Sequence, residues 1–325
     1  MEKPLIMSES TGLSVVVLAG GISHERDVSL RSGRRVADAL LQAGHRVELR
    51  DPDAGLLPYL AERRPDVVFP ALHGSSGEDG SLLELLAAIA MPTVGSTGAA
   101  ARRAWSKPVA TSLVAQAGVA VPDSIVLSHE AFRELGAASV LRVVREALDG
   151  DLVVKPGAGG SAQGVTIVED PTELPRAMVD AFTYDDIAIV ERRVVGTELA
   201  IAIVETDGAP RPLTAVEIVP TTGVYSFQAR YNAGETTFFA PCRLDDETVA
   251  RATDAALLAH RTLGLRDLSR VDLIVDAAGT PWFLEANVLP GLTETSLVPL
   301  AIEASDTDAA TVYDALVRGA VARAA

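Results

Sequence analysis

Short, continuous apolar runs alternate with amphipathic segments through the first third of the chain. The apolar runs have strand length, and they predict strands at residues 14–19, 45–49 and 66–70. The segments between them follow a helical pattern, which predicts helices at 28–43, 56–63 and 80–90. Gly44, directly after the first helix, is a typical helix stop. Apolar strands separated by helices indicate a parallel sheet covered on both faces, so a Rossmann-like domain is predicted to end near Gly95.

The pattern changes in the middle of the chain. Helices are expected near residues 107–117 and 129–148. Strands are expected at 152–155 and 165–168, on either side of a glycine-rich stretch.

Strands dominate the last part. Segments 198–205 and 213–219 alternate well enough to form an antiparallel pair with a turn at Asp207-Gly208. A loop without clear periodicity covers 221–241, and loops of this length often carry function. A helix at 246–263, a hairpin at 270–287 and terminal helices complete an α/β chain. Three units are expected, at residues 1–95, 96–190 and 191–325.

Composition narrows the class of protein. Of the 325 residues 48% are hydrophobic and 22% charged, which is ordinary for a globular protein with a real core. The net charge of −16, without any Lys/Arg run, argues against a nucleic-acid partner. Cys242 is the single cysteine, which excludes an internal disulfide framework and suits a reducing compartment. We see no signal peptide and no apolar run long enough to span a membrane, so a cytoplasmic protein is expected.

The hairpin at 270–287 predicts a metal site. If Ala278-Gly279 is the centre of its turn, Asp272 faces Glu285, and Arg270 and Asn287 share their side of the sheet. Two facing carboxylates repel each other unless a positive charge lies between them. Carboxylate and amide oxygens suit Mg²⁺, which usually also binds substrate phosphates. The alternative is an exposed sheet face whose charge Arg270 neutralises.

The glycine-rich stretch at 153–165 is a candidate phosphate loop. A strand ends at Lys155, and four glycines leave backbone N–H groups unobstructed. Only three of the 28 basic residues are lysines (Lys3, Lys107 and Lys155), and the two interior ones call for a chemical role beyond base composition. The stretch is not a Walker A loop, and by itself it is equally compatible with a plain turn.

Two further loops follow strands at the same predicted sheet edge, where open α/β sheets bind ligands. The first carries Glu25 and Asp27, anions that suit a substrate ammonium group, although Glu25 could equally cap the following helix. Its glycine spacing differs from the dinucleotide-binding fingerprint, which argues against NAD. The second carries His73 and Glu78 among glycines.

Together these motifs resemble the D-alanine–D-alanine ligase family of the ATP-grasp superfamily, over about residues 14–305. The motifs are Gly20-Gly-x-Ser-x-Glu-x-Asp-Val-Ser-Leu30, Leu72-His-Gly-x-x-Gly-Glu-Asp-Gly80, Lys155-Pro156 with Gly160-Ser161, Arg270-x-Asp272, and Glu285-Ala-Asn-x-x-Pro-Gly-x-Thr293 through Ser296-Leu297. The resemblance implies an ATP-grasp fold of three α/β domains, whose N-terminal domain is Rossmann-like and whose two C-terminal domains hold ATP.

The resemblance also implies roles for individual residues. ATP would be bound by Lys107, Lys155, Gly160, Glu191, Val194, Glu198 and Arg230. Asp272, Glu285 and Asn287 would bind Mg²⁺, with two ions expected and Mn²⁺ as a substitute. The catalytic group would comprise Glu25, Ser161, Tyr231, Arg270 and Gly291. The substrates would contact Val28, Ser29, His73, Ser296 and Leu297.

The implied reaction joins two D-alanines, with ATP, through an acyl phosphate, for peptidoglycan precursor synthesis by a homodimer. Three positions depart from the family pattern: Ser106, Ala158-Gly159, and Arg230 in place of a lysine. The implied lid, 224–237, also differs, so the second substrate is less defined than the first. A paralogous ligase of antibiotic biosynthesis or self-resistance, with another acceptor, is the alternative. A nucleotide-binding regulator without catalysis is disfavoured by the intact motifs.

Overall fold

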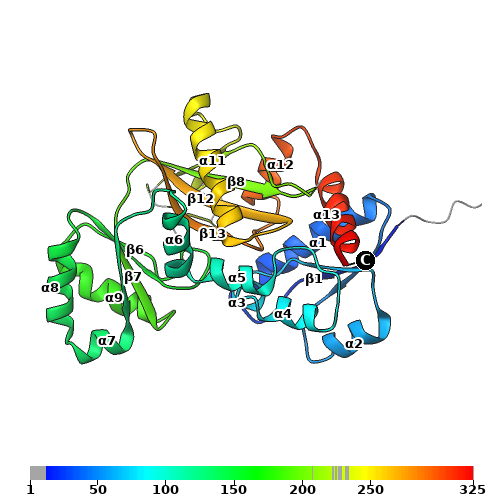
Figure 1. Cartoon of the computed structure of the whole chain (residues 1–325), viewed down its shortest axis with the longest axis horizontal. Coiled ribbons are helices and arrows are strands. Elements are labelled where there is room, and N and C mark those ends of the chain that lie inside the picture. Colours follow the sequence, from blue (N-terminus) through cyan, green and yellow to red (C-terminus); the bar gives the residue numbers. More distant parts are fainter. Residues whose placement is uncertain are drawn as a thin grey trace, which may run out of the picture.

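The computed structural model describes residues 12–324, except 207, 222, 224, 226–228 and 231–233. The described chain forms three units, each built on its own sheet (Figure 1). The central unit of the sequence, in green, lies at one end of the molecule, and the N-terminal unit, in blue, lies at the other. The C-terminal sheet lies between them, so that it can contribute to a site on either side.

The N-terminal unit is a parallel sheet, as the apolar pattern predicts. Its strands are β1 (Ser14–Leu18), β2 (Arg46–Arg50) and β3 (Val67–Pro70), in the order β2-β1-β3. Its helices are α1 (Arg26–Gln42), α2 (Leu56–Arg63), α3 (Ser75–Glu78) and α4 (Ser81–Ala88). β1 and β3 are buried along nearly their whole length, which explains why they lack polar positions.

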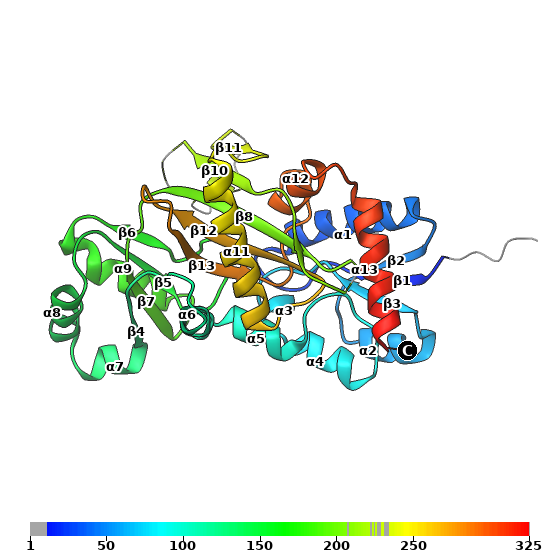
Figure 2. The same ribbon diagram turned by 45° about the horizontal axis from the view of Figure 1, so that its top comes forward.

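The last helix of the chain, α13 (Ala309–Ala324), packs on this first unit, against α1 and β3 (Figures 1 and 2). The Tyr313 ring meets Phe69 edge-on, with 5.5 Å between the ring centroids. His45 Nε2 donates to the Asp314 carboxylate at 2.8 Å, because Nδ1 already accepts from the Leu13 N–H. The core of the N-terminal unit is therefore completed by α13.

The central unit has an antiparallel sheet in the order β4-β7-β5-β6 and an apolar core of its own. Its strands are β4 (Ser124–Ser128), β5 (Leu152–Pro156), β6 (Thr166–Val168) and β7 (Ile187–Arg192). The helix predicted at 129–148 is two helices, α7 (His129–Glu134) and α8 (Ala137–Ala147). Gly136 separates them with a φ of +81° that ends the first run. The pattern did not predict η1 (Pro171–Glu173) or α9 (Leu174–Phe182), the elements that lead back to β7.

The C-terminal sheet is antiparallel along the order β11-β10-β8-β12-β13, with the short β9 beside β8. Its strands are β8 (Thr197–Val204), β9 (Arg211–Pro212), β10 (Val216–Pro220), β11 (Thr236–Phe239), β12 (Leu268–Val275) and β13 (Pro281–Asn287). The expected pairing of 198–205 with 213–219 is confirmed by β8 and β10, while Asp207 of the predicted turn lies outside the described residues.

In the described part of the chain, four helices pack against this sheet. They are α5 (Gly98–Trp105), α6 (Lys107–Gln116), α11 (Asp246–Leu263) and α12 (Leu297–Glu303). Within the described ranges, none of the protein's helices has both the length and the apolar composition needed to cross a bilayer.

The hairpin of β12 and β13 confirms the predicted opposition of Asp272 with Glu285 and of Arg270 with Asn287. The prediction assumed a two-residue turn at Ala278-Gly279 and a regular register, and the structure differs from both assumptions in ways that cancel. The turn is one residue longer than assumed, since Asp276 and Thr280 close it through the Asp276 N–H and the Thr280 carbonyl. A bulge then leaves Leu284 without a partner, because Leu273 pairs with Phe283, and this extra residue restores the register.

The expected boundary between residues 190 and 191 falls inside β7, which belongs wholly to the central sheet. By sheet membership the change to the C-terminal unit comes between β7 and β8. By packing, α13 joins the first unit, although the sequence division places it in the third. The division into three units remains an interpretation of these sheets.

Candidate active site

Two cavities adjoin at the C-terminal sheet. The first, of about 240 Å³, lies between the central and C-terminal sheets, and we call it the nucleotide cavity. The second, of about 90 Å³, lies between the N-terminal unit and the loop that follows β13, and we call it the substrate cavity. Tyr225 and Arg230 line both cavities, and the Arg230 guanidinium lies 4.3 Å from the centre of the Tyr225 ring.

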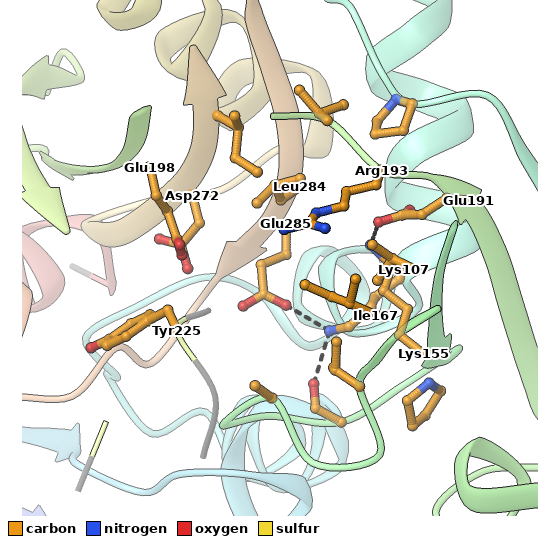
Figure 3. Close-up of a pocket in the computed structure, with 18 of the residues that line it drawn as sticks. Lys107, Lys155, Ile167, Glu191, Arg193, Glu198, Tyr225, Asp272, Leu284 and Glu285 are labelled. Atoms are coloured by element: carbon orange, nitrogen blue, oxygen red, sulfur yellow. Dashed lines mark hydrogen bonds and ion pairs between the residues drawn. The ribbon is translucent and has the colours of Figure 1, made fainter. Parts of the chain in front are cut away.

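Lysines from two elements enter the nucleotide cavity, each paired with a glutamate (Figure 3). Lys107, the first residue of α6, lies 2.7 Å from Glu285 Oε2 and donates to the Gly159 carbonyl at 2.9 Å. Lys155, on β5, lies 2.7 Å from Glu191 Oε1 on the neighbouring strand β7. The structure therefore brings together the two interior lysines that the composition singled out.

The other residues expected to bind ATP also lie around this cavity: Gly160, Val194, Glu198 and Arg230. Glu198 is on β8, and its burial raises the pKa of its carboxyl to about 7, the largest of several effects. Arg193, which lies between the expected Glu191 and Val194, lines the cavity too, as does Leu284, which was not predicted. Leu284 is the residue of the bulge, which no strand pattern indicates.

Asp272 and Glu285 face the nucleotide cavity side by side, each held by a different cation. Arg270 donates two hydrogen bonds of 2.7 Å to Asp272, and the Asn287 amide lies 3.3 Å from the same carboxylate. Burial opposes the charge on Arg270, but Asp272 outweighs it and raises the pKa of the guanidinium. Burial likewise opposes the charge on Glu285, but Lys107, foremost among the nearby cations, holds the pKa of that carboxyl below its usual range.

The donor set on this face fits Mg²⁺. Two carboxylates and one amide offer hard oxygen ligands, and Mg²⁺ commonly takes only one or two carboxylates from the protein and the rest from phosphates and water. No group of three or more His, Cys, Asp and Glu side chains in the described residues could hold a metal by itself. The expected ligands thus depend on the amide and on a phosphate-bearing substrate.

The glycine-rich loop joins the two cavities. Ser161 and Ala162 adopt φ values of +53° and +54°, which direct the loop towards the N-terminal unit. The Ser161 hydroxyl donates to Glu25, and a Cβ at Gly160 would come 3.0 Å from the same carboxylate. Tyr231, the expected partner of Ser161, lies outside the described residues.

Most of the expected substrate residues line the second cavity. They are Glu25, Val28, His73, Ser161, Arg270, Gly291, Ser296 and Leu297. Ser29 does not line it, because its hydroxyl is buried between the Gly20 N–H, 2.8 Å away, and the Ala71 carbonyl, 2.7 Å away. Ser29 therefore fixes the loop that carries Glu25 and does not present a group to the cavity.

A buried relay fixes the loop that carries Gly291. His73 Nδ1 donates to the Leu289 carbonyl at 3.0 Å, and the Ser32 hydroxyl donates to His73 Nε2 at 2.9 Å. Ser32 in turn accepts from the Leu292 N–H at 3.1 Å. Burial, the largest effect, lowers the pKa of His73, so the ring is neutral and its tautomer is set by the carbonyl. His73 and Ser32, both from the N-terminal unit, thereby fix the backbone before and after Gly291, at Leu289 and Leu292.

Glu78 lines the substrate cavity as a buried carboxyl, 8% exposed, at the end of α3. Its Oε1 accepts from the Gly74 N–H at 2.9 Å. Burial and, secondly, the charge of Glu25 raise the pKa of Glu78 to about 8. The sequence singles out this residue only as a neighbour of His73.

Sequence reasoning missed Ser32, Arg31, Tyr225 and Thr295, which line the substrate cavity or fix its wall. Ser32 lies four residues after Val28 on α1, a spacing that places both on one face of a helix, so the signal was present. Tyr225 lies in the unpatterned loop, where no spacing indicates a direction.

Comparison with known proteins gives consistent matches. A family model described as "D-ala D-ala ligase C-terminus" matches residues 113–318. The D-alanine–D-alanine ligase of Anaeromyxobacter sp. (strain K) is 42% identical over 299 residues, which cover 90% of this chain and 92% of the relative.

Solved structures also match nearly the whole chain. The D-alanine–D-alanine ligase from Bacillus anthracis complexed with ATP shares the fold, with a TM-score of 0.80 and 24% identity. The match covers 96% of this chain and 99% of that one. VanG, a D-Ala:D-Ser ligase from Enterococcus faecalis, matches with a TM-score of 0.78 and 25% identity, over 94% of this chain and 99% of that one.

Proposed function

The chain belongs to the D-alanine–D-alanine ligase family, and we propose that its two cavities are the nucleotide and amino-acid sites of that reaction. The protein is an ATP-dependent ligase that joins two D-alanines and forms D-alanyl-D-alanine, ADP and phosphate. One observation carries the assignment of the cavities: the carboxylates of Asp272 and Glu285 line the first cavity together with Lys107 and Lys155. The second cavity, lined by Glu25 and Gly291, lies next to it.

In the first step, the carboxylate of one D-alanine attacks the γ-phosphorus of ATP and forms an acyl phosphate. Lys107 and Lys155 place positive charge beside the phosphates, and Glu25 binds the ammonium group of this first D-alanine. Asp272, Glu285 and Asn287 would hold Mg²⁺, which when bound neutralises phosphate charge. In the ATP complex the two lysines would exchange their glutamate partners, 2.7 Å away in each pair, for phosphate oxygens.

In the second step, the amine of the other D-alanine attacks the acyl carbon. Arg270 and the backbone N–H near Gly291 stabilise the negative oxygen that develops, since donors fixed before the reaction need no rearrangement during it. Arg270 is fixed by its two bonds to Asp272, and Gly291 by the relay of Ser32 and His73 on either side. Ser296, whose hydroxyl lies 2.8 Å from that of Thr293, borders the carboxylate site of the second D-alanine.

Water must be kept from the acyl phosphate, and we assign this role to residues 224–237, of which Tyr225 and Arg230 already cover both cavities. We also propose, from family membership, that the product serves peptidoglycan precursor synthesis in the cytoplasm and that the enzyme is a homodimer.

The test is a phosphate-release assay with ATP, Mg²⁺ and single amino acids. We expect release with D-alanine and none with L-alanine, since the family model and the curated relatives that match this chain are D-alanine–D-alanine ligases. Equal stimulation by L-alanine, or none by D-alanine, would contradict the assignment. Preferential use of D-serine as the acceptor, as the name of VanG describes for that protein, would support the paralogous alternative.

A further inference from the structure

The substrate cavity contains one buried carboxyl without a cationic partner. Among the described residues, no Lys, Arg or His nitrogen lies within 4.0 Å of the Glu78 carboxyl oxygens. Its Gly74 hydrogen bond occupies one oxygen and can be made by either protonation state. Three carboxylates of the nucleotide cavity, Asp272, Glu285 and Glu191, each have an arginine or lysine at 2.7 Å. Glu198, which has no ion pair to another described residue, lines the nucleotide cavity and not the substrate cavity.

We propose that Glu78 is the general base that takes a proton from the ammonium group of the second D-alanine before its amine attacks. The proposal rests on the ligase function assigned above and adds to it a residue for the second step. Two amino acids enter the site, each with an ammonium group, and Glu25 is placed for the first of them. Glu78 is the second carboxyl of the same cavity, and Gly291 and Arg270 line the same walls.

Burial favours this transfer. An ammonium ion beside a carboxylate exchanges its proton more readily in a buried site, since the products, an amine and a carboxylic acid, are both neutral. The charged and titratable groups around Glu78 are Glu25, Glu285, Arg270, Lys107 and His73, and Arg31, Tyr225 and Arg230 line the same cavity. The first two favour the protonated acid, and Arg270 opposes it. The resulting pKa of about 8 suits a base, because a base works best when its pKa is near the working pH.

The step balances as follows. The ammonium group gives its first proton to the Glu78 carboxylate, and the neutral amine forms a C–N bond with the acyl carbon. The bond between that carbon and the phosphate oxygen then breaks, and the phosphate leaves with the electron pair. The nitrogen gives its second proton to the departing phosphate, and Glu78 returns its proton to solvent after product release.

The experiment compares two acceptors in wild type and Glu78→Gln. Glutamine keeps the oxygen that accepts from Gly74 and the size of the neutral side chain, but it cannot accept the proton. D-Alanine needs deprotonation, whereas hydroxylamine is largely uncharged at neutral pH and traps the acyl phosphate directly as D-alanyl hydroxamate. We expect dipeptide formation to fall about 100-fold, the lower end for loss of a general base, and hydroxamate formation to change less than about twofold.

A matched control is Glu84→Gln, which removes an exposed carboxylate from α4, outside both cavities, and is expected to change neither product. Retained hydroxamate formation also shows that the variant is folded and that its nucleotide site works. An equal fall for both acceptors would assign Glu78 to positioning or to the first step, and an unchanged dipeptide rate would exclude it; either result overturns the proposal. Wild type that makes no dipeptide would instead contradict the ligase function itself.

Discussion

The nucleotide cavity and the substrate cavity hold their polar groups in different ways. In the first, three ion pairs are buried: Lys107 with Glu285, Lys155 with Glu191, and Arg270 with Asp272 at the border. In the second, Ser32, His73 and the loop around Gly291 are joined by hydrogen bonds between neutral groups. On the proposed function, the first arrangement would exchange partners when a polyanion and a cation enter, and the second would keep a fixed shape around a small zwitterion. A change of charge should therefore be severe in the first cavity, and a change of shape should matter more in the second.

The largest effect is expected for Glu285→Gln, which should lower turnover at least about 1,000-fold, as for the loss of a key transition-state contact. The sequence, which shows two facing carboxylates, predicts that the change stabilises the unliganded protein. The structure reverses that expectation, because Lys107 would lose the negative charge of its partner at 2.7 Å, at a cost of about 1–3 kcal/mol. Urea unfolding and steady-state kinetics measure the two effects.

The control for this variant is Glu217→Gln. Glu217 is a buried glutamate of the same sheet, bound by Arg243 and outside both cavities, so its loss should reduce stability and leave turnover unchanged. If Glu285→Gln keeps wild-type activity at limiting Mg²⁺, the metal does not bind at this face.

A smaller effect is expected on the pH dependence of stability. It comes from Glu78, the carboxyl of the substrate cavity that has no cationic partner among the described residues. Its folded pKa of about 8 lies above the ordinary 4.5, so between these pH values the folded protein keeps a proton that the unfolded chain has lost. Stability must then fall as pH rises, by up to about 1.4 kcal/mol per pH unit for one group, and level off above about pH 8.

Comparison with Glu78→Gln isolates this contribution, since the variant cannot titrate there. From pH 6 to pH 8 the wild type should lose about 2 kcal/mol of unfolding free energy relative to the variant, measured by urea unfolding at both pH values. If the unfolding free energies of the two proteins change in parallel with pH, Glu78 is ionised at both pH values, and the substrate cavity holds a charged carboxylate.

The smallest effect is expected for Ser32→Ala, which changes no charge. The variant leaves the Leu292 N–H and His73 Nε2 without a partner, so the loop of Gly291 loosens at a cost of about 1–1.5 kcal/mol. The KM for the second D-alanine should rise about tenfold while the KM for ATP stays the same. Ser305→Ala, which removes a hydroxyl that bonds Thr214 away from both cavities, is the control. A rise in both KM values would show that the relay supports the whole fold and not the loop alone.

How far the sequence predicts the site depends on whether a site residue lies on a strand or on a loop. Strand residues are predictable, because alternation and register place Asp272 beside Glu285 once a hairpin is found, although here the bulge at Leu284 had to offset a longer turn. Residues on the 221–241 loop have no such rule. Tyr225 was missed, and the role expected of Tyr231 stays a prediction because that residue lies outside the described part. The general α/β class and the N-terminal parallel sheet follow from periodicity. In the central sheet only β5 and β6 were predicted, and the break of the helix at Gly136 depended on one backbone angle.

The position of α13 has a consequence for the order in which the protein is made. The first ninety residues leave the ribosome long before the sixteen residues of α13, yet Tyr313, Val312 and Leu316 belong to the same core as Val15 and Phe69. Domains usually fold as they emerge, from the N-terminus onwards. Here one face of the N-terminal sheet, which α1 covers in part, stays incompletely covered until α13 has been synthesised. The N-terminal unit is therefore completed only after α13 has been made, and the substrate cavity, which needs Glu25 and His73 of that unit in place, matures no earlier.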